Sequence, residues 1–118
     1  MSSELDAVIE SMRERHSYTV EVELYSDEYV IVRCSGELEV SSRAELSSTL
    51  DRFLRPGTAI DVDFSAVTFI YSGAANVVID AAERADGRLR VLATTRPVRM
   101  VFHALGADGL LVDDLQTL

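Results

Sequence analysis

The chain contains no lysine and no tryptophan, and its 118 residues include a single cysteine and two histidines. All 11 basic residues are arginines, against 20 acidic residues, so the formal net charge is −9. Nucleic-acid binding depends on clusters of basic side chains that neutralise backbone phosphates. Because the chain has so few basic residues, the sequence argues against nucleic acid and against an anionic membrane surface as partners.

The presence of only one cysteine excludes two kinds of site. Cys34 cannot form a disulfide within the chain, and no Cys-rich metal site can be built. It shares a strand face with Val30 and Val32, which favours an inert buried thiol over a redox switch. No apolar run approaches the roughly 20 residues that cross a bilayer, and residues 1–15 lack the apolar core of a signal peptide. A reducing, cytoplasmic location is therefore expected.

A chain of this length, with 47% hydrophobic residues, is long enough for one two-layer domain and too short for two. Its apolar periodicity predicts, in order, a short amphipathic helix, a hairpin and then alternating helices and strands. This order predicts an α/β layer structure with parallel later strands. The expected elements are a helix over 3–15, strands over 18–25 and 29–34, a helix over 42–54, a strand over 59–64, a connection over 65–71, a helix to residue 85, a strand over 88–93, a helix from 94 or 95 to 105, and a short strand over 109–112.

No set of residues matches a known catalytic or cofactor motif. Ser72, His103 and several aspartates are the elements of a hydrolase, but no G-x-S-x-G elbow occurs. Neither a G-x-x-x-x-G-K-[ST] loop nor a G-x-G-x-x-G loop is present, so no nucleotide cofactor is expected. Asp61 and Asp63, like Asp113 and Asp114, are interpreted as solvated carboxylates at strand ends, because their spacing resembles no calcium loop. The sequence therefore indicates no enzyme, metal or cofactor.

One segment, residues 63–73, leads from a strand to a helix and presents a hydroxyl, that of Ser72, where the helix begins. Two interpretations stay open. Ser72 is either a simple N-cap, or a site where an added phosphoryl group is tolerated by the positive end of the helix dipole.

The chain resembles the stand-alone STAS domains over residues 18–115. The residues that carry the resemblance are the S-G-E-L-E run at 35–39, similar to the family's G-E-L-D, and D-F-S-A-V-T-F-I at 63–70, similar to D-L-S-x-V-x-F-I. Further similarity lies at residues 81–85, 87–91, 97–102 and 105–106. The resemblance implies a single domain over 17–118, with a mixed four- to five-stranded sheet and helices mainly on one face. The amphipathic helix expected before it, over 1–16, lies outside the resemblance. That helix is expected either to cover a sheet edge or to make a homodimer contact.

The best-known members of this family are anti-sigma factor antagonists, which bind an anti-sigma factor and so free a sigma factor for transcription. The anti-sigma factor is often a kinase-like ATPase that phosphorylates the antagonist in a D-S-[ST]-G motif. In an ungapped alignment that motif falls on Tyr71, Ser72, Gly73 and Ala74, so the acceptor position has no hydroxyl. Either Ser72 accepts phosphate after a one-residue shift, or the chain is not controlled in this way. The second alternative is preferred, because a shift of one residue turns a helical side chain by about 100°.

The resemblance also implies a partner-binding surface. Tyr71 on it is interpreted either as an exposed aromatic anchor, since Tyr is enriched at interface hot spots, or as a core residue. An acidic rim suits a partner with a basic face, and residues 1–51 hold 12 acids against 4 arginines. The alternative function is a STAS module of another system, a stressosome-like scaffold or a lipid-transport subunit. The expected surface comprises Glu37, Glu39, Ser41, Ser42, Tyr71, Ser72, Gly73 and Asn76.

Overall fold

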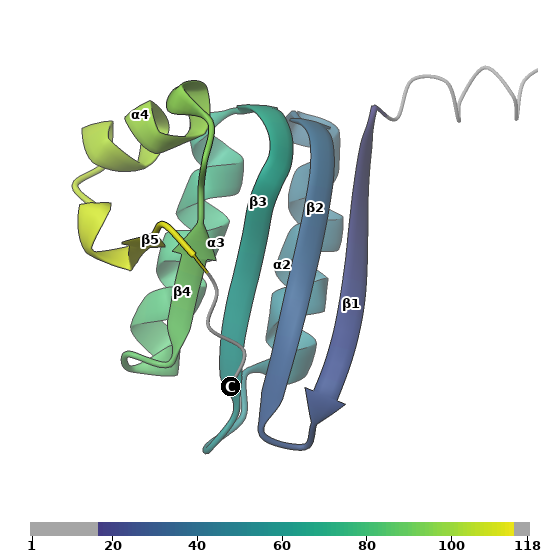
Figure 1. The fold of residues 1–118 in the computed structure, drawn as a ribbon. Helices are drawn as coiled ribbons and strands as arrows, with labels where there is room; N and C mark the ends of the chain where they lie inside the picture. The colour runs from purple at the N-terminus through teal and green to yellow at the C-terminus, as the bar shows by residue number, and fades with distance from the viewer. Residues whose placement is uncertain (1–16, 115–118) are drawn as a thin grey trace, which may run out of the picture.

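The computed structural model of the chain describes residues 17–114 (Figure 1). The helix expected over 1–16 lies outside the described residues. The described elements are β1 (Tyr18–Ser26), β2 (Tyr29–Leu38), the 3-10 turn η1 (Val40–Ser42), α2 (Arg43–Phe53), β3 (Ala59–Ile70), α3 (Ser72–Ala85), β4 (Leu89–Leu92), α4 (Arg96–Ala104), the 3-10 turn η2 (Asp108–Leu110) and β5 (Leu111–Val112).

The strands form one five-stranded sheet in the order β1-β2-β3-β4-β5. β1 and β2 pair antiparallel as the expected hairpin, whereas β2/β3, β3/β4 and β4/β5 pair parallel. The predicted mixed sheet is therefore confirmed. Because β2, β3 and β4 are parallel, their carboxyl ends lie at one end of the sheet, where α2 and α3 also begin (Figure 1).

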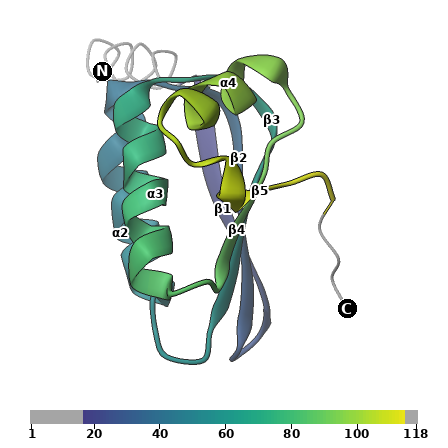
Figure 2. The ribbon, with the colours of Figure 1, turned by 90° about the vertical axis from the view of Figure 1, so that its left-hand side faces the viewer.

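α2 and α3 lie side by side against one face of the sheet, as Figure 2 shows. Their inward sides contact a core built from alternate residues of the strands, and Phe64 and Phe102 bring two rings of this core to 6.2 Å between centroids. The buried side of α3 is made largely of small residues, among them Ala74, Ala75, Ala81 and Ala85, which lets the helix lie close to the sheet. The face of the sheet turned away from α2 and α3 is called the open face below.

Two strands are longer than their sequence patterns predict. β3 does not end at Phe64 but runs to Ile70, and β2 continues through Gly36 to Leu38. The pairing of β2 with β3 shifts register between Arg33 and Ser35 and again after Gly36. These irregularities break the two-residue alternation, so the later half of β3 reads as a connection in the sequence although it is paired strand. Within residues 17–114 no helix is long and apolar enough to span a membrane.

Cys34 has 3% exposure on the core side of β2, and burial raises the pKa of its thiol from 9.0 to about 12. The thiolate is therefore disfavoured only in the folded chain. The contribution of this one proton to the free energy of unfolding is fully present below about pH 9. Between about pH 9 and about pH 12 it is lost by about 1.4 kcal/mol per pH unit. Urea unfolding between about pH 9 and about pH 10.5 is expected to show a loss about 2 kcal/mol larger in the wild type than in Cys34→Ala. Equal losses in both proteins would contradict the assignment.

Candidate partner-binding surface

The expected site lies where β2 and β3 end. Glu37 pairs with Phe69 and Leu38 with Ile70 in the parallel ladder, and the backbone N–H of Tyr71 donates to the carbonyl of Leu38 at 3.0 Å. Leu38 and Ile70 are buried, so their neighbours Glu37 and Phe69 point to the open side. The strand ends therefore hold the start of α3 beside residues 37–41.

Tyr71 and Gly73 contact each other across the first turn of α3. The ring of Tyr71 lies so close to Gly73 that a Cβ atom at residue 73 would stand 2.5 Å from Cζ and Oη of the ring. Real side chains do not approach so closely, so this ring position requires glycine. Tyr71 is half-buried and contacts the hydrophobic core. The ring thus fills the space that a phosphoacceptor side chain at position 73 would occupy.

Ser72 is not the N-cap of α3, contrary to the first interpretation of its role. Tyr71 is the N-cap, with φ −85° and ψ 158°, and its carbonyl accepts from the N–H groups of Ala74 at 3.1 Å and Ala75 at 3.2 Å. Ser72 is the first helical residue, and its exposed side chain makes no hydrogen bond within the part of the chain that the structure describes. Its hydroxyl is free to contact a partner.

The structure brings seven of the eight expected surface residues to this end of the molecule and buries the eighth. The prediction that Ser42 is a contact residue is wrong, because Ser42 is fully buried. Its hydroxyl donates to the carbonyl of Glu39 at 2.7 Å and so stabilises the η1 turn. Gly73 and Tyr71 are half-buried. The exposed members are Glu37, Glu39, Ser41, Ser72 and Asn76.

Two apolar residues at this site are absent from the sequence-based set. Val40 is 71% exposed and Phe69 is 45% exposed, and with Glu39, Ser41 and Tyr71 they line a shallow groove of about 400 Å³. Phe69 lies two residues after buried Val67, so simple alternation would place it in the core. The register shift after Gly36 turns it outward. These two apolar groove residues could not be found from periodicity.

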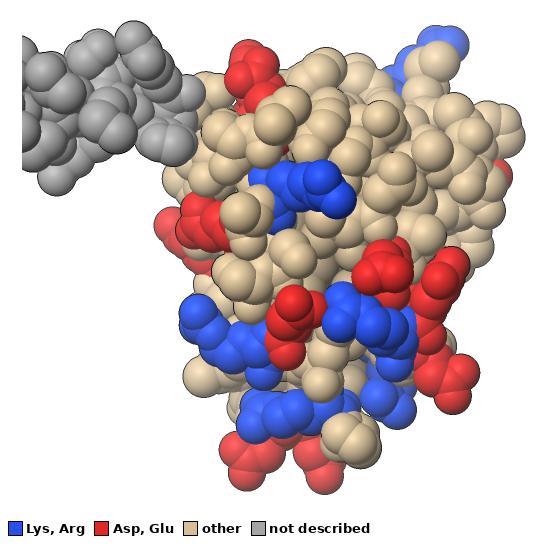
Figure 3. Space-filling view, turned by 180° about the vertical axis from the view of Figure 1, so that it is seen from behind, with Lys and Arg blue, Asp and Glu red and all other residues tan. Residues whose placement is uncertain are grey.

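The charges of the helix side are concentrated away from this site. In Figure 3 arginines and acidic residues alternate over the lower part of that face, where α2 and α3 end, and the upper part shows few charged groups. At the site itself, the side chains of Glu37 and Glu39 make no ion pair within residues 17–114. They form an exposed acidic rim beside the groove.

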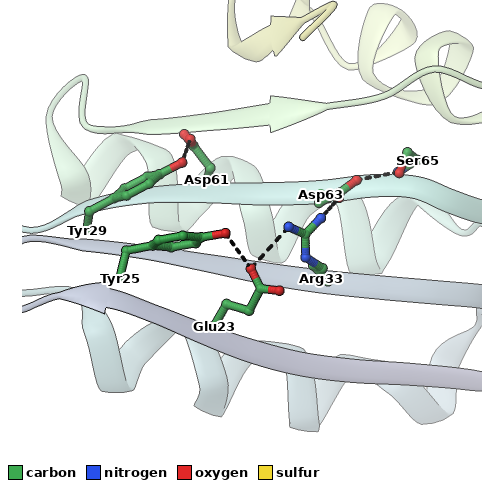
Figure 4. Close-up of polar contacts among 7 residues, drawn as sticks. All are labelled: Glu23, Tyr25, Tyr29, Arg33, Asp61, Asp63 and Ser65. Carbon is green, nitrogen blue, oxygen red and sulfur yellow. Dashed lines mark hydrogen bonds and ion pairs between the residues drawn. The ribbon is translucent and has the colours of Figure 1, made fainter. Parts of the chain in front are cut away.

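The open face carries a polar network that the sequence interpretation missed (Figure 4). Asp61 is 2% exposed and Asp63 is 5% exposed, so neither is a solvated strand end as expected. Arg90 donates to both oxygens of Asp61, from Nε at 2.9 Å and from Nη2 at 2.8 Å. Tyr29 also donates to Asp61, and its pKa is raised to about 12 by burial first and by this hydrogen bond second.

The second part of the network crosses three strands. Arg33 donates to Asp63 from one nitrogen and to Glu23 from the other, the latter at 3.1 Å, and Asp63 also accepts from the backbone N–H of Ser65 at 2.9 Å (Figure 4). The carboxylates raise the pKa of Arg33 further above its usual range. Each of the two buried carboxylates, Asp61 and Asp63, is therefore paired with an arginine. This network ties β1, β2, β3 and β4 together, and it lies outside the expected partner surface.

The other groups considered for catalysis do not come together. His103 is exposed, and its Nδ1 lies 2.8 Å from Asp108 Oδ2. No hydrogen bond links it to Ser72 within the described residues. Over residues 17–114 no group of three or more His, Cys, Asp or Glu residues is placed to hold a metal ion.

Comparison with known proteins agrees with the observed fold. No curated protein sequence matches the chain. The solved structure of the anti-sigma factor antagonist SpoIIAA in its unphosphorylated form matches with a TM-score of 0.74 at 21% identity, covering 83% of this chain and 90% of that chain. An anti-sigma factor antagonist from Mycobacterium paratuberculosis matches with a TM-score of 0.74 at 25% identity, covering 84% and 88%. The phosphorylated form of the Bacillus protein SpoIIAA matches with a TM-score of 0.68 at 19% identity, covering 83% and 93%.

A family model described as "Mlab, STAS domain" matches residues 25–113, which includes every strand and helix of the structure from β2 onward. The chain therefore belongs to the STAS-domain family.

Proposed function

We propose that this chain is an anti-sigma factor antagonist, which binds an anti-sigma factor and thereby releases a sigma factor for transcription. The observation that carries the proposal is the similarity, over most of both chains, to a solved anti-sigma factor antagonist at 25% identity. The chain acts by binding in this proposal, through the exposed residues of the proposed contact surface at the end of β2 and the start of α3.

The proposed contact surface comprises the exposed residues Glu37, Glu39, Ser41, Ser72 and Asn76, with Tyr71 and Gly73 between them. The acidic rim suits a basic face on the anti-sigma factor, since opposite charges steer association and fix orientation. The anti-sigma factor is proposed to be of the kinase-like ATPase type. Binding is proposed to continue without phosphate control at position 73, because that position has neither a hydroxyl nor space for one beside Tyr71.

The proposal is tested by affinity capture from the native cytosol with the whole chain as bait, followed by mass spectrometry. An anti-sigma factor is expected among the captured proteins for the wild type. A Glu39→Arg bait is expected to retain at most a tenth of it, because reversing a rim charge places like charges across the interface.

The matched control is Glu21→Arg, which reverses an exposed glutamate of β1 that makes no ion pair within the described residues. This bait is expected to capture as much anti-sigma factor as the wild type. Capture without any anti-sigma factor, or equal loss with both variants, would count against the proposal.

The second candidate is a STAS module of another system, a stressosome-like scaffold or a lipid-transport subunit. The observation that favours it is the description of the matching family model, "Mlab, STAS domain", which names no anti-sigma factor. The same capture experiment distinguishes the two functions. Membrane ATPase subunits in place of an anti-sigma factor would support the second.

A further inference from the structure

We propose that the groove between Val40 and Phe69 is an anchor site for an apolar side chain of the partner, and that the partner's contacting segment carries basic residues on either side of that anchor. This inference rests on the proposed function, and it names the chemistry by which the same surface recognises its partner. It adds Val40 and Phe69 to the residues expected to contact the partner.

The groove is apolar on its two walls. Val40 begins η1, one residue beyond the end of β2, and Phe69 is the residue of β3 paired with Glu37. Their exposures, 71% and 45%, make them two of the few large exposed hydrophobic side chains in the described part of the chain. Half-buried Tyr71 also lines the groove. Side chains that expose this much apolar surface in one place are typical of an interaction site.

Tyr71 is the part of the groove lining that the fold fixes in place. It is held by the core on one side and by Gly73 on the other, and no side chain at position 73 stands in its way. A preformed apolar pocket binds with little loss of conformational entropy, and fully desolvated aromatic contacts dominate interface energies. An aliphatic or aromatic side chain of the partner is therefore the group that this groove fits.

The charge of the rim selects the rest of the partner's segment. Glu39 itself lines the groove, and Glu37 stands beside Phe69 across the strand pair. Both carboxylates are exposed and make no ion pair within residues 17–114. Arginine or lysine next to the anchor would pair with them. A second copy of this chain is a poor occupant, because a symmetric contact through this surface would bring the same carboxylates together.

The test measures the affinity of the captured anti-sigma factor for three single variants. Phe69→Ser and Val40→Ser remove the two walls, and each is expected to weaken binding at least tenfold. The matched control is Leu24→Ser, which removes a 68% exposed side chain from β1, at the far end of that strand. It is expected to bind as the wild type does. Thermal unfolding of each variant establishes that it is folded.

A second arm uses a probe of defined chemistry, a hexapeptide with two central leucines flanked by arginines, followed by nuclear magnetic resonance of the whole chain. Saturable shifts are expected at residues 39–41 and 69–71. A peptide with glycines in place of the leucines is expected to give none. Shifts of equal size with both peptides, or no shifts with either, would overturn the anchor.

The outcomes separate the two proposals. If the anti-sigma factor binds both groove variants as tightly as the wild type, the anchor is wrong and the proposed function stands. If no anti-sigma factor binds the wild type, the proposed function fails, and the peptide arm alone then supports or overturns the groove as an apolar and acidic site.

Discussion

An Asp61→Ala variant is expected to unfold with a free energy about 2 to 3 kcal/mol below that of the wild type. The carboxylate is 2% exposed, and its loss leaves Arg90 and the Tyr29 hydroxyl without their acceptor. Removing one partner of a buried ion pair costs about 3 to 5 kcal/mol when the remaining charge is fully buried. The cost here is smaller because the Arg90 side chain is 39% exposed and can turn toward water. Urea unfolding at neutral pH measures it.

The control for this prediction is Asp51→Ala. Asp51 accepts from Arg84 at 2.9 Å, but both side chains are about half exposed, at 52% and 50%. Exposed ion pairs contribute roughly 0 to 1 kcal/mol. A loss for Asp61→Ala no greater than that for Asp51→Ala would contradict the role assigned to the open-face network.

A Tyr71→Asp, Gly73→Ser double variant is expected to become a substrate of the kinase-type anti-sigma factor. The double substitution removes the ring from the start of α3 and places a hydroxyl at the position where the family's motif has its acceptor. A phosphoryl group there would be stabilised by the N-terminal end of the helix dipole. Mass spectrometry after incubation with the anti-sigma factor and ATP is expected to give one phosphoryl addition, at residue 73, and at least a tenfold weaker complex.

The wild type and Ser72→Ala separate the alternatives in the same experiment. The wild type is expected to gain no mass, or a single phosphoryl group that Ser72→Ala abolishes. Gly73→Ser alone is expected to lose about 1 to 3 kcal/mol of stability, because its Cβ meets the Tyr71 ring and forces a shift. Phosphorylation of the wild type at a residue other than Ser72 would show that the site is assigned wrongly.

The element order could be predicted from the sequence because apolar periodicity is a local property. The strand predicted over 18–25, the helix predicted to end at residue 85 and the helix predicted from 94 or 95 each correspond to an observed element. The family motifs then placed Tyr71 and Gly73 at the start of a helix, and the structure has α3 beginning at Ser72. Short-range patterns were sufficient for these features.

The features that the sequence pattern did not predict depend on contacts between residues of different elements. Asp61 looks like a solvated carboxylate until β4 brings Arg90 beside it, 29 residues later in the chain. Phe69 looks like a core residue until the register shift against β2 turns it outward. Ser42 looks like a surface hydroxyl until η1 folds it under Glu39. Pairing register and burial are tertiary properties, so the sequence pattern alone could not supply them.

Displacement of a sigma factor tests the proposed function most directly. A complex of the captured anti-sigma factor with fluorescently labelled sigma factor is titrated with the wild-type chain, and the anisotropy of the label reports release. Release is expected to be complete at saturating wild-type chain. Phe69→Ser and Glu39→Arg are each expected to need at least a tenfold higher concentration than the wild type for half-maximal release. Sigma factor that stays bound at saturating wild-type chain would contradict an antagonist function.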